Sequence, residues 1–117
     1  MNKIKIGIMS TEEVSQRVID IAAGRYVPKR GEPKIWFSSM KSLAEVLSDN
    51  NRALLKIIAE SKPENIKELA EISGRKPSNL SRTLKTFEKY GFVEMVATKR
   101  SKRPVAKAMD FDICIPA

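Results

Sequence analysis

Histidine is absent from this chain of 117 residues, and cysteine occurs once, at Cys114. The lack of histidine removes the most common general base and the most common metal ligand, and one cysteine cannot form an intramolecular disulfide. We therefore expect no enzyme, no metal site and no cofactor. Cys114 lies in the apolar run DICI, which favours a small strand or core residue over a reactive thiol.

Long apolar runs and aromatic residues are also scarce. No stretch approaches the roughly 18 apolar residues of a membrane span, and the opening MNKIKIGIMSTEEV lacks the core of a signal peptide. We therefore expect a cytoplasmic protein without a membrane partner. Aromatic residues make up 6% of the chain, too few for the stacking platforms that single-stranded nucleic acids favour, so RNA is the weaker nucleic-acid alternative.

Acidic residues are few in one part of the chain. Residues 75–107 hold 10 Lys or Arg against 2 Asp or Glu, whereas residues 1–74 hold 12 against 10. Such an asymmetry is typical of a surface that binds phosphates. The alternative, from charge alone, is a solubilising face. The carboxylates Glu64, Glu68 and Glu71 have the spacing of a solvated helix face and are a weak signal for an enzyme.

The first part of the chain has the pattern of a strand, a helix and a strand. Isoleucines alternate with other residues in KIKIGIM (3–9), which predicts a half-buried strand. Ser10 and Glu13 have the spacing of a capping box, which predicts the start of a helix of about 13 residues. After a loop with Pro and Gly, KIWFSS (34–39) predicts a second strand, which we expect to pair with the first. We interpret residues 1–39 as an N-terminal extension for dimerisation or partner binding.

Residues 40–117 change to a helical pattern and then to a basic hairpin. Apolar spacing predicts four helices, which begin at Met40, Arg52, Glu64 and Pro77 and of which the last ends near residue 90. FVEMVAT (92–98) and PVAKAMDFDICI (104–115) predict the two strands of a hairpin, with KRSKR (99–103) at its tip. The order matches a winged helix-turn-helix. The expected fold class is therefore α+β, mainly α, with residues 40–117 as a DNA-binding domain.

The helix 77–90 has an unusual polar face. Leu80, Leu84 and Phe87 recur as its apolar stripe, so its short polar and basic residues point outward or sideways. Arg suits guanine, Asn suits adenine, and Ser suits bases or phosphates. We expect Arg82 and Asn79 to read bases. The expected phosphate contacts are Arg75, Lys76, Ser78, Ser81 and Lys85 from this helix and its entry, and Lys99, Arg100, Lys102 and Arg103 from the hairpin. The alternative is an ordinary amphipathic helix beside a solvated loop.

The stretch NIKELAEISGRKPSNLSRTLKTFEKYGFVEM (65–95) resembles the winged-helix transcriptional regulators of the MarR and ArsR class. The shared features are a Leu-Ala pair, a Gly turn, a Ser-x-x-Ser-Arg-x-Leu helix and a Lys-Tyr-Gly-Phe-Val exit. Over about residues 34–97 the chain is also similar to short prokaryotic DNA-binding regulators, some of which act as antitoxins beside TumE-type toxins. The resemblance implies a homodimer that binds double-stranded DNA and represses transcription, with autoregulation of its operon if a toxin gene is adjacent. The alternative function is an antitoxin that neutralises a cognate toxin through the N-terminal segment.

A homodimer is expected on physical grounds as well, because specific binding generally needs two half-sites. The sequence offers three apolar surfaces for it without a choice among them. They are the strand Ile4-Ile6-Ile8, the helix stripe Val14-Val18-Ile21 and the alternation Met109-Phe111-Ile113.

Overall fold

The computed structural model describes residues 2–116. Residues 1 and 117, the outer limits of the two units predicted from the sequence, lie outside this part. The described residues form an α+β fold that is mainly helical, as expected. In chain order the elements are β1 (Asn2–Ile8), α1 (Thr11–Ala22), β2 (Ile35–Phe37), α2 (Met40–Val46), α3 (Asp49–Ser61), α4 (Ile66–Ser73), α5 (Pro77–Lys89), β3 (Val93–Ala97), β4 (Lys102–Ala106) and β5 (Ala108–Cys114).

Three strands form a parallel sheet in the order β2-β1-β5. The predicted pairing of the first two strands is confirmed, with α1 as the connection between them. Ile6 of β1 is fully buried, and Ile4 and Ile8 pack partly buried against the same core. The isoleucine face of β1 therefore belongs to the interior of the chain, and the expectation that it could serve as a dimer surface is wrong.

Gly7 of β1 is needed for a close approach between β1 and β2. It is paired in register with Trp36, whose ring lies over it. A Cβ atom at position 7 would stand 2.1 Å from Cζ3 of Trp36, well inside van der Waals contact. Only glycine fits here without displacement of the indole.

The C-terminal strand differs from the expectation. The sequence predicts residues 104–115 as one strand of the hairpin, but the strand breaks at Lys107, whose N–H donates to the Phe92 carbonyl at 2.9 Å. Beyond the break, β5 leaves the hairpin and pairs with β1. Burial explains the change of partner: Ala108 is fully buried, and the ring of Phe111 packs edge-on against Phe92 at 5.1 Å between centroids.

The β3–β4 hairpin has a smaller tip than expected. The two strands are antiparallel, from Val93 opposite Ala106 to Ala97 opposite Lys102. Lys102 and Arg103 therefore belong to β4, and the tip itself contains Lys99 and Arg100.

Helices α2–α5 pack in the order that the apolar pattern predicts, around one core to which α1 contributes no buried residue. Its most buried side chains are Leu54, Leu55 and Ile58 of α3, Leu69 of α4, and Leu80, Leu84 and Phe87 of α5. Because β5 pairs with β1, the sheet joins residues from both sides of the boundary predicted at residue 39. That boundary stays a prediction.

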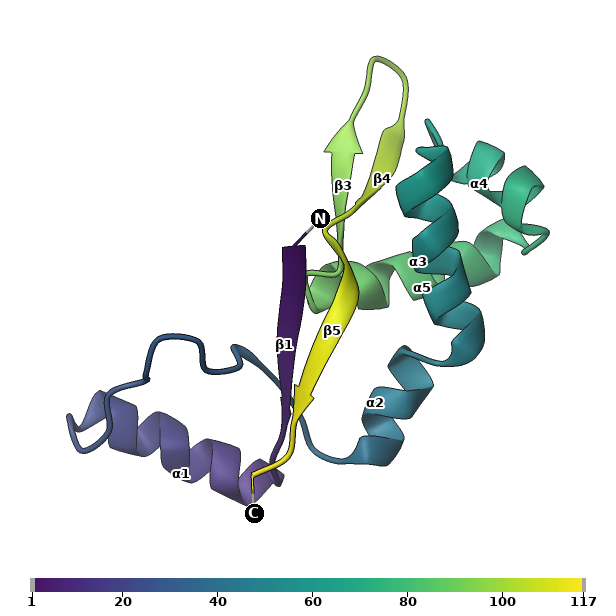
Figure 1. Ribbon diagram of the computed structural model, residues 1–117. Helices are drawn as coiled ribbons and strands as arrows, with labels where there is room; N and C mark the ends of the chain where they lie inside the picture. Colours follow the sequence, from purple (N-terminus) through teal and green to yellow (C-terminus); the bar gives the residue numbers. More distant parts are fainter. Residues whose placement is uncertain (1, 117) are drawn as a thin grey trace.

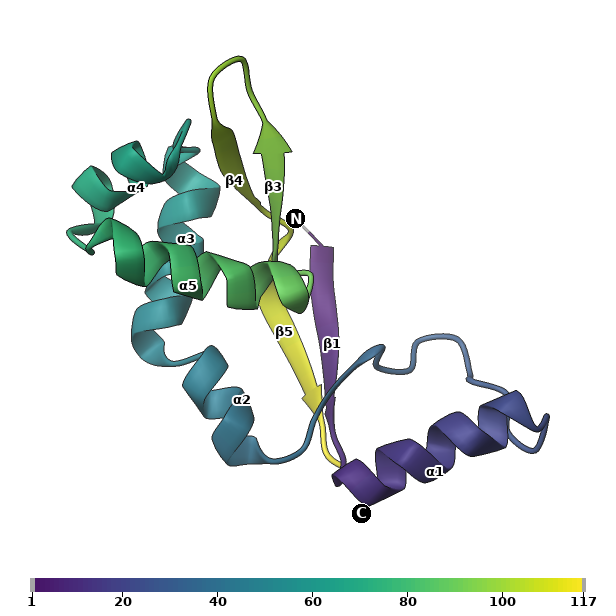
Figure 2. The same ribbon diagram turned by 180° about the vertical axis from the view of Figure 1, so that it is seen from behind.

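The molecule is elongated, with principal extents of 49 × 29 × 24 Å. Figure 1 shows α1 at one end, directed away from α2–α5. Figure 2 shows α5 across the opposite half, with α4 near its first turn and the β3–β4 hairpin rising from its last turn. Within residues 2–116, no helix has both the length and the apolar character needed to cross a membrane.

Candidate nucleic-acid interface

Local sequence features fix the start and the end of α5. Gly74 ends α4 with a φ of 74°, a conformation that favours glycine. Pro77 occupies the first turn of α5, where its missing N–H is not needed, and Gly91 follows the helix with a φ of 77°. These residues give α5 defined ends and hold it next to α4.

The buried stripe of α5 determines which side faces solvent. Leu80, Leu84 and Phe87 are at most 2% exposed, which confirms the predicted stripe. The remaining candidates on the helix are outside the core: Ser78, Asn79, Arg82 and Lys85 are exposed, and Ser81 is half-buried. Asn79, Arg82 and Lys85 follow one another at three-residue intervals, so they lie along one side of the helix.

The first turn of α5 lacks a capping side chain. Ser10, Ser39, Ser48 and Asn65 accept from the backbone of the other four helices, whereas Lys76 makes no such bond at the start of α5. The backbone N–H groups of a first turn attract anions. This end of α5 adjoins a cavity of about 470 Å³, lined by Ser48, Asn50, Asn51, Arg75, Lys76 and Asn79.

Arg75 has a structural role that its charge did not reveal. Its guanidinium donates to Oδ1 of Asn51 at 3.1 Å and to the carbonyl of Asn50 at 2.7 Å. Arg75 therefore connects the turn between α4 and α5 to the start of α3. The sequence predicts a phosphate contact for Arg75, but the structure directs the guanidinium to protein acceptors.

Asn50 and Asn51 were missed as members of this region. Nothing in the segment SDNN (48–51) was predicted to contact a nucleic acid. One feature of this segment could have indicated its position: it concentrates short hydroxyl and amide side chains, which are common in phosphate contacts.

The hairpin tip presents two cations on a hydrogen-bonded turn. The N–H of Thr98 donates to the Ser101 carbonyl at 2.7 Å, and the hydroxyl of Thr98 donates to the same oxygen at 2.9 Å. Lys99 and Arg100 lie between them and are exposed, as is Lys102. The tip and the start of α4 enclose a cavity of about 410 Å³ that Lys99, Arg100 and Asn65 line.

Arg103 is half-buried and connects the hairpin to α3. Its Nη2 donates to the Lys62 carbonyl at 3.2 Å, where α3 ends. Its Nε is buried and has no hydrogen-bond partner among residues 2–116. The sequence predicts a DNA backbone contact for Arg103, whereas the structure gives its Nη2 a protein acceptor.

The structure brings six of the eleven predicted residues together in two groups, whereas Ser78, Ser81, Arg82, Lys85 and Lys102 line neither cavity. Arg75, Lys76 and Asn79 share the cavity at the start of α5, and Lys99, Arg100 and Arg103 share the cavity at the hairpin tip. Of the ten cations in residues 75–107, Lys107 pairs with Glu94, and Arg75 and Arg103 donate to neutral protein groups. Within the part that the structure describes, the other seven form no ion pair: Lys76, Arg82, Lys85, Lys89, Lys99, Arg100 and Lys102.

The perturbed ionisable groups lie elsewhere, around α1. The Tyr26 hydroxyl donates to Glu32, and the Arg17 guanidinium also contacts this carboxylate, so the pKa of Glu32 lies below its ordinary value. The hydrogen bond to Glu32 in turn raises the pKa of Arg17. The Arg17 guanidinium also stands 4.8 Å from the ring centroid of Tyr26 and 5.3 Å from that of Trp36. This cluster attaches one side of α1 to the following loop and to β2.

The architecture is that of an α+β protein with a basic helix and a basic hairpin. Residues 46–113, more than half of the chain, match the model of the family HVO_A0114, and the chain belongs to this family. The match includes α3, α4, α5 and the hairpin, and leaves out β1, α1 and β2. No curated protein and no solved structure matches the chain.

Proposed function

We propose that this protein is a winged helix-turn-helix regulator of transcription that binds double-stranded DNA in a sequence-specific way. In this proposal α4 and α5 are the helix-turn-helix, α5 enters the major groove, and the β3–β4 hairpin is the wing. The protein acts as a homodimer and represses transcription, including that of its own operon.

The proposal rests on seven cations, on α5, at its N-cap residue Lys76 and on the hairpin, that have no ion-pair partner within residues 2–116. Glu88 and Glu94 are the two acidic residues in the same 33-residue block, and Lys107 already pairs with Glu94. A concentration of like charges costs free energy through self-repulsion, and a polyanion relieves it.

The exposed side of α5 supplies side chains suited to base edges. Arg82 offers a bidentate donor for guanine, and Asn79 offers a donor and an acceptor for adenine. Both are exposed near the first half of the helix, the part that reaches bases in helix-turn-helix proteins. The uncapped first turn with Lys76 is suited to a phosphate of the flanking backbone.

Selection of duplexes from a random pool tests the proposal. The full chain should enrich a motif with a dyad, and that duplex should bind at least about a thousandfold more tightly than a scrambled duplex at the same salt concentration. Enrichment of no motif, with equal affinity for selected and scrambled duplexes, would contradict sequence-specific binding. Competition by a structured RNA at equal concentration would point instead to an RNA-binding function.

An antitoxin function is the second candidate, because α1 exposes apolar side chains that a partner protein could cover. Val18 and Ile19 are 59% and 53% exposed. If the chain neutralises a toxin, a protein encoded in the same operon should co-purify with it, and Val18→Asp should release that protein. A chain that purifies without any such protein from its native operon would count against this function.

A further inference from the structure

Exposed apolar side chains gather in two places outside the proposed DNA-binding unit. In the described part of the chain, ten large apolar residues are well exposed, and clustered ones indicate an interaction surface more than single ones do. Four lie on α1 or in the loop after it, and four lie on or beside β5. In chain order these are Val18, Ile19, Ile21 and Val27, and then Met40, Met109, Ile113 and Ile115; the other two are Ile72 and Val96.

The first place is the α1 patch, formed by Val18 and Ile21, which lie three residues apart on one face of the helix. None of the twelve residues of α1 is buried, although the helix is amphipathic and attached by the Arg17 cluster. An amphipathic helix obtains most of its stability from packing of its apolar face. The α1 patch therefore lacks a cover within residues 2–116.

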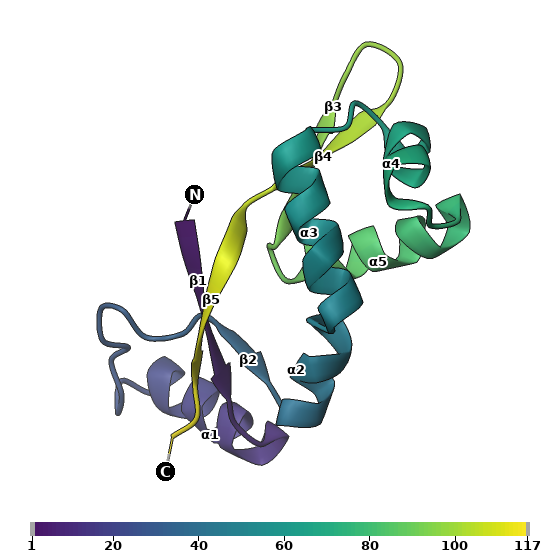
Figure 3. The same cartoon turned by 45° about the vertical axis from the view of Figure 1, so that its right-hand side comes forward.

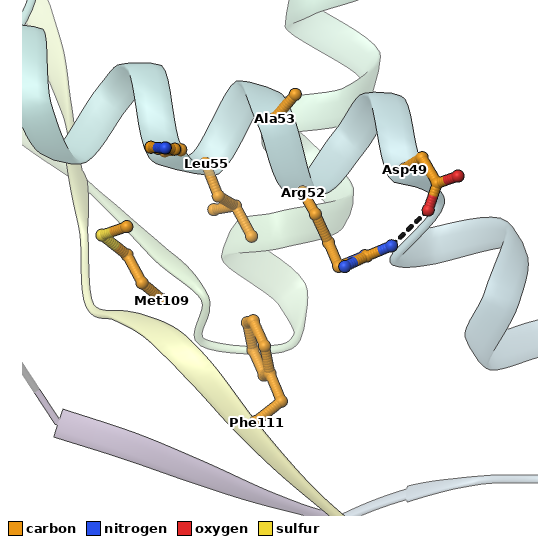
Figure 4. A pocket seen from close by; sticks show the side chains of 7 residues that line it. Asp49, Arg52, Ala53, Leu55, Met109 and Phe111 are labelled. Atoms are coloured by element: carbon orange, nitrogen blue, oxygen red, sulfur yellow. Dashed lines mark hydrogen bonds and ion pairs between the residues drawn. The ribbon is translucent and has the colours of Figure 1, made fainter.

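The second place is the β5 groove, between β5 and the helices α2 and α3. Two cavities of about 420 and 400 Å³ have Arg52, Met109 and Phe111 in common, so they form one continuous groove. Figure 4 shows Met109 and Phe111 of β5 on one side of it and Leu55 of α3 on the other. β5 is an edge strand of its sheet, and Figure 3 shows α3 beside the upper part of β5.

The two surfaces match in length and chemistry. A helix of twelve residues such as α1 is roughly 18 Å long, and a strand of seven residues such as β5 is roughly 23 Å long. Three charged side chains besides Asp49 line the groove: Arg52 pairs with Asp49, and Lys56 and Asp110 are exposed. An apolar helix face that enters the groove therefore leaves the Arg52 charge paired.

The total surface is larger than one compact chain of this size should expose. The accessible area is 8038 Å², whereas a compact monomer of 13.2 kDa has roughly 6,400 Å². The radius of gyration is 16.3 Å, against roughly 13 Å for a compact domain of this length. The surplus of roughly 1,600 Å² exceeds the roughly 800 Å² that each partner buries in a standard interface.

We infer that a second copy of this chain covers both surfaces, with the α1 patch of each protomer packed into the β5 groove of the other. Each chain carries both halves of the contact, so a two-fold axis satisfies both at once and closes the assembly at two copies. This inference rests on the proposed function only for the use of the dimer on DNA, and it identifies the surface through which the regulator dimerises.

The oligomeric state in the absence of DNA tests the inference. Sedimentation equilibrium of the full chain at micromolar concentration should give twice the chain mass of 13.2 kDa. Val18→Asp in the α1 patch and Met109→Lys in the β5 groove should each weaken the dimer at least tenfold. Ile72→Asp is the matched control, because Ile72 is also well exposed, at 45%, but lies on α4 outside both surfaces.

Mixing the two variants distinguishes two arrangements. In one the α1 patch packs into the β5 groove of the other copy, and in the other each surface packs against its own copy. Val18→Asp keeps an intact groove and Met109→Lys keeps an intact α1 patch, so an equimolar mixture should restore a heterodimer with one intact contact. Far-ultraviolet circular dichroism should show that each variant is folded; if either is not, Ile21→Asp and Met40→Lys replace them.

A monomeric wild-type chain would overturn the inference, as would two monomeric variants that stay monomeric when mixed. A wild-type chain that associates only with a protein from its operon would overturn it in favour of the antitoxin function. Fluorescence anisotropy titrations on a duplex with a single half-site separate the dimer surface from the proposed DNA-binding function. A monomer that still selects its half-site refutes the dimer surface alone, and a dimer that binds no DNA refutes the DNA-binding function alone.

Discussion

At the scale of single residues, two arginines near the start of α5 have different surroundings. Arg82 is exposed, whereas the guanidinium of Arg75 donates to Asn50 and Asn51. We expect Arg82→Ala to weaken binding to the selected duplex by about 1–3 kcal/mol and to relax specificity at one base pair, with no change in the unfolding midpoint.

Arg75→Ala serves as the comparison for Arg82→Ala. It should lower the thermal midpoint, because the connection between α3 and the turn before α5 is lost. Anisotropy titrations and thermal unfolding on both variants separate the two roles. Unchanged binding by Arg82→Ala would remove this side chain from the proposed base contacts.

Glu32 gives the stability of the α1 region a dependence on pH. The Tyr26 hydroxyl and then Arg17 lower its pKa in the folded state, so its contribution is complete above the ordinary pKa of an unfolded glutamate. That contribution is lost as the pH falls through the folded pKa. We expect Glu32→Gln to lower the thermal midpoint at pH 7, and the difference from wild type to shrink as the pH falls below the ordinary pKa of a glutamate side chain. Glu12→Gln, on an exposed carboxylate of the same region, is the control, and a difference that does not shrink toward acid pH would contradict the role of Glu32.

At the scale of elements, the β3–β4 hairpin should act on DNA without regard to sequence. Lys99, Arg100 and Lys102 are exposed and form no ion pair within residues 2–116. Joint replacement of these three residues by Ala should weaken binding to the selected duplex and to the scrambled duplex by similar factors. It should also reduce the slope of log affinity against log salt concentration by up to about 3. Replacement of Lys29, Arg30 and Lys34, in the loop before β2, is the charge-matched control. A loss confined to the selected duplex would show that the hairpin reads sequence instead.

The contact between β1 and β2 depends on a missing side chain. Gly7→Ala places a methyl group 2.1 Å from a ring carbon of Trp36, and we expect a loss of about 1–3 kcal/mol in the free energy of unfolding. In a Trp36→Ala background Gly7→Ala should cause a much smaller loss in the free energy of unfolding. Urea denaturation of the four chains of this double-mutant cycle measures the coupling. Equal costs in both backgrounds would show that the indole does not cause the loss.

Periodicity and capping residues were sufficient to predict the number and order of the helices, the pairing of β1 with β2 and the buried stripe of α5. Two helix starts were wrong: α3 begins at Asp49 instead of Arg52, and α4 at Ile66 instead of Glu64. The partner of β5 could not be predicted, because β-forming residues indicate a strand but not its neighbour. Phe111 packs on Phe92 and β5 pairs with β1, both of them contacts between distant parts of the chain. The positive charge of Arg75 and Arg103 likewise carried no sign of the carbonyl and amide acceptors that the folded chain brings to them.

At the scale of the whole molecule, the reciprocal dimer predicts the form of the operator. Two copies of α5 related by a two-fold axis would read two half-sites about 10 base pairs apart, or a multiple of that distance. Insertion of 5 base pairs between the half-sites turns one of them to the opposite side of the duplex. We expect this insertion to reduce binding of the wild-type chain to the level of a single half-site in anisotropy titrations, and to leave binding by monomeric Val18→Asp unchanged. Equal affinity for both spacings would contradict a rigid dimer on DNA.

The parallel pairing of β5 with β1 also sets a time order for folding. Ile4 and Phe111 are neighbours in the sheet although more than one hundred positions separate them along the chain. A ribosome that adds 5–20 residues per second needs roughly 5–20 s to synthesise that interval. By the end of that interval the residues of α3, α4 and α5 have been synthesised, and until then β1 lacks one of its two neighbouring strands. The β5 groove exists only after β5 has emerged, so the helices proposed to contact DNA form before the surface proposed to join two copies.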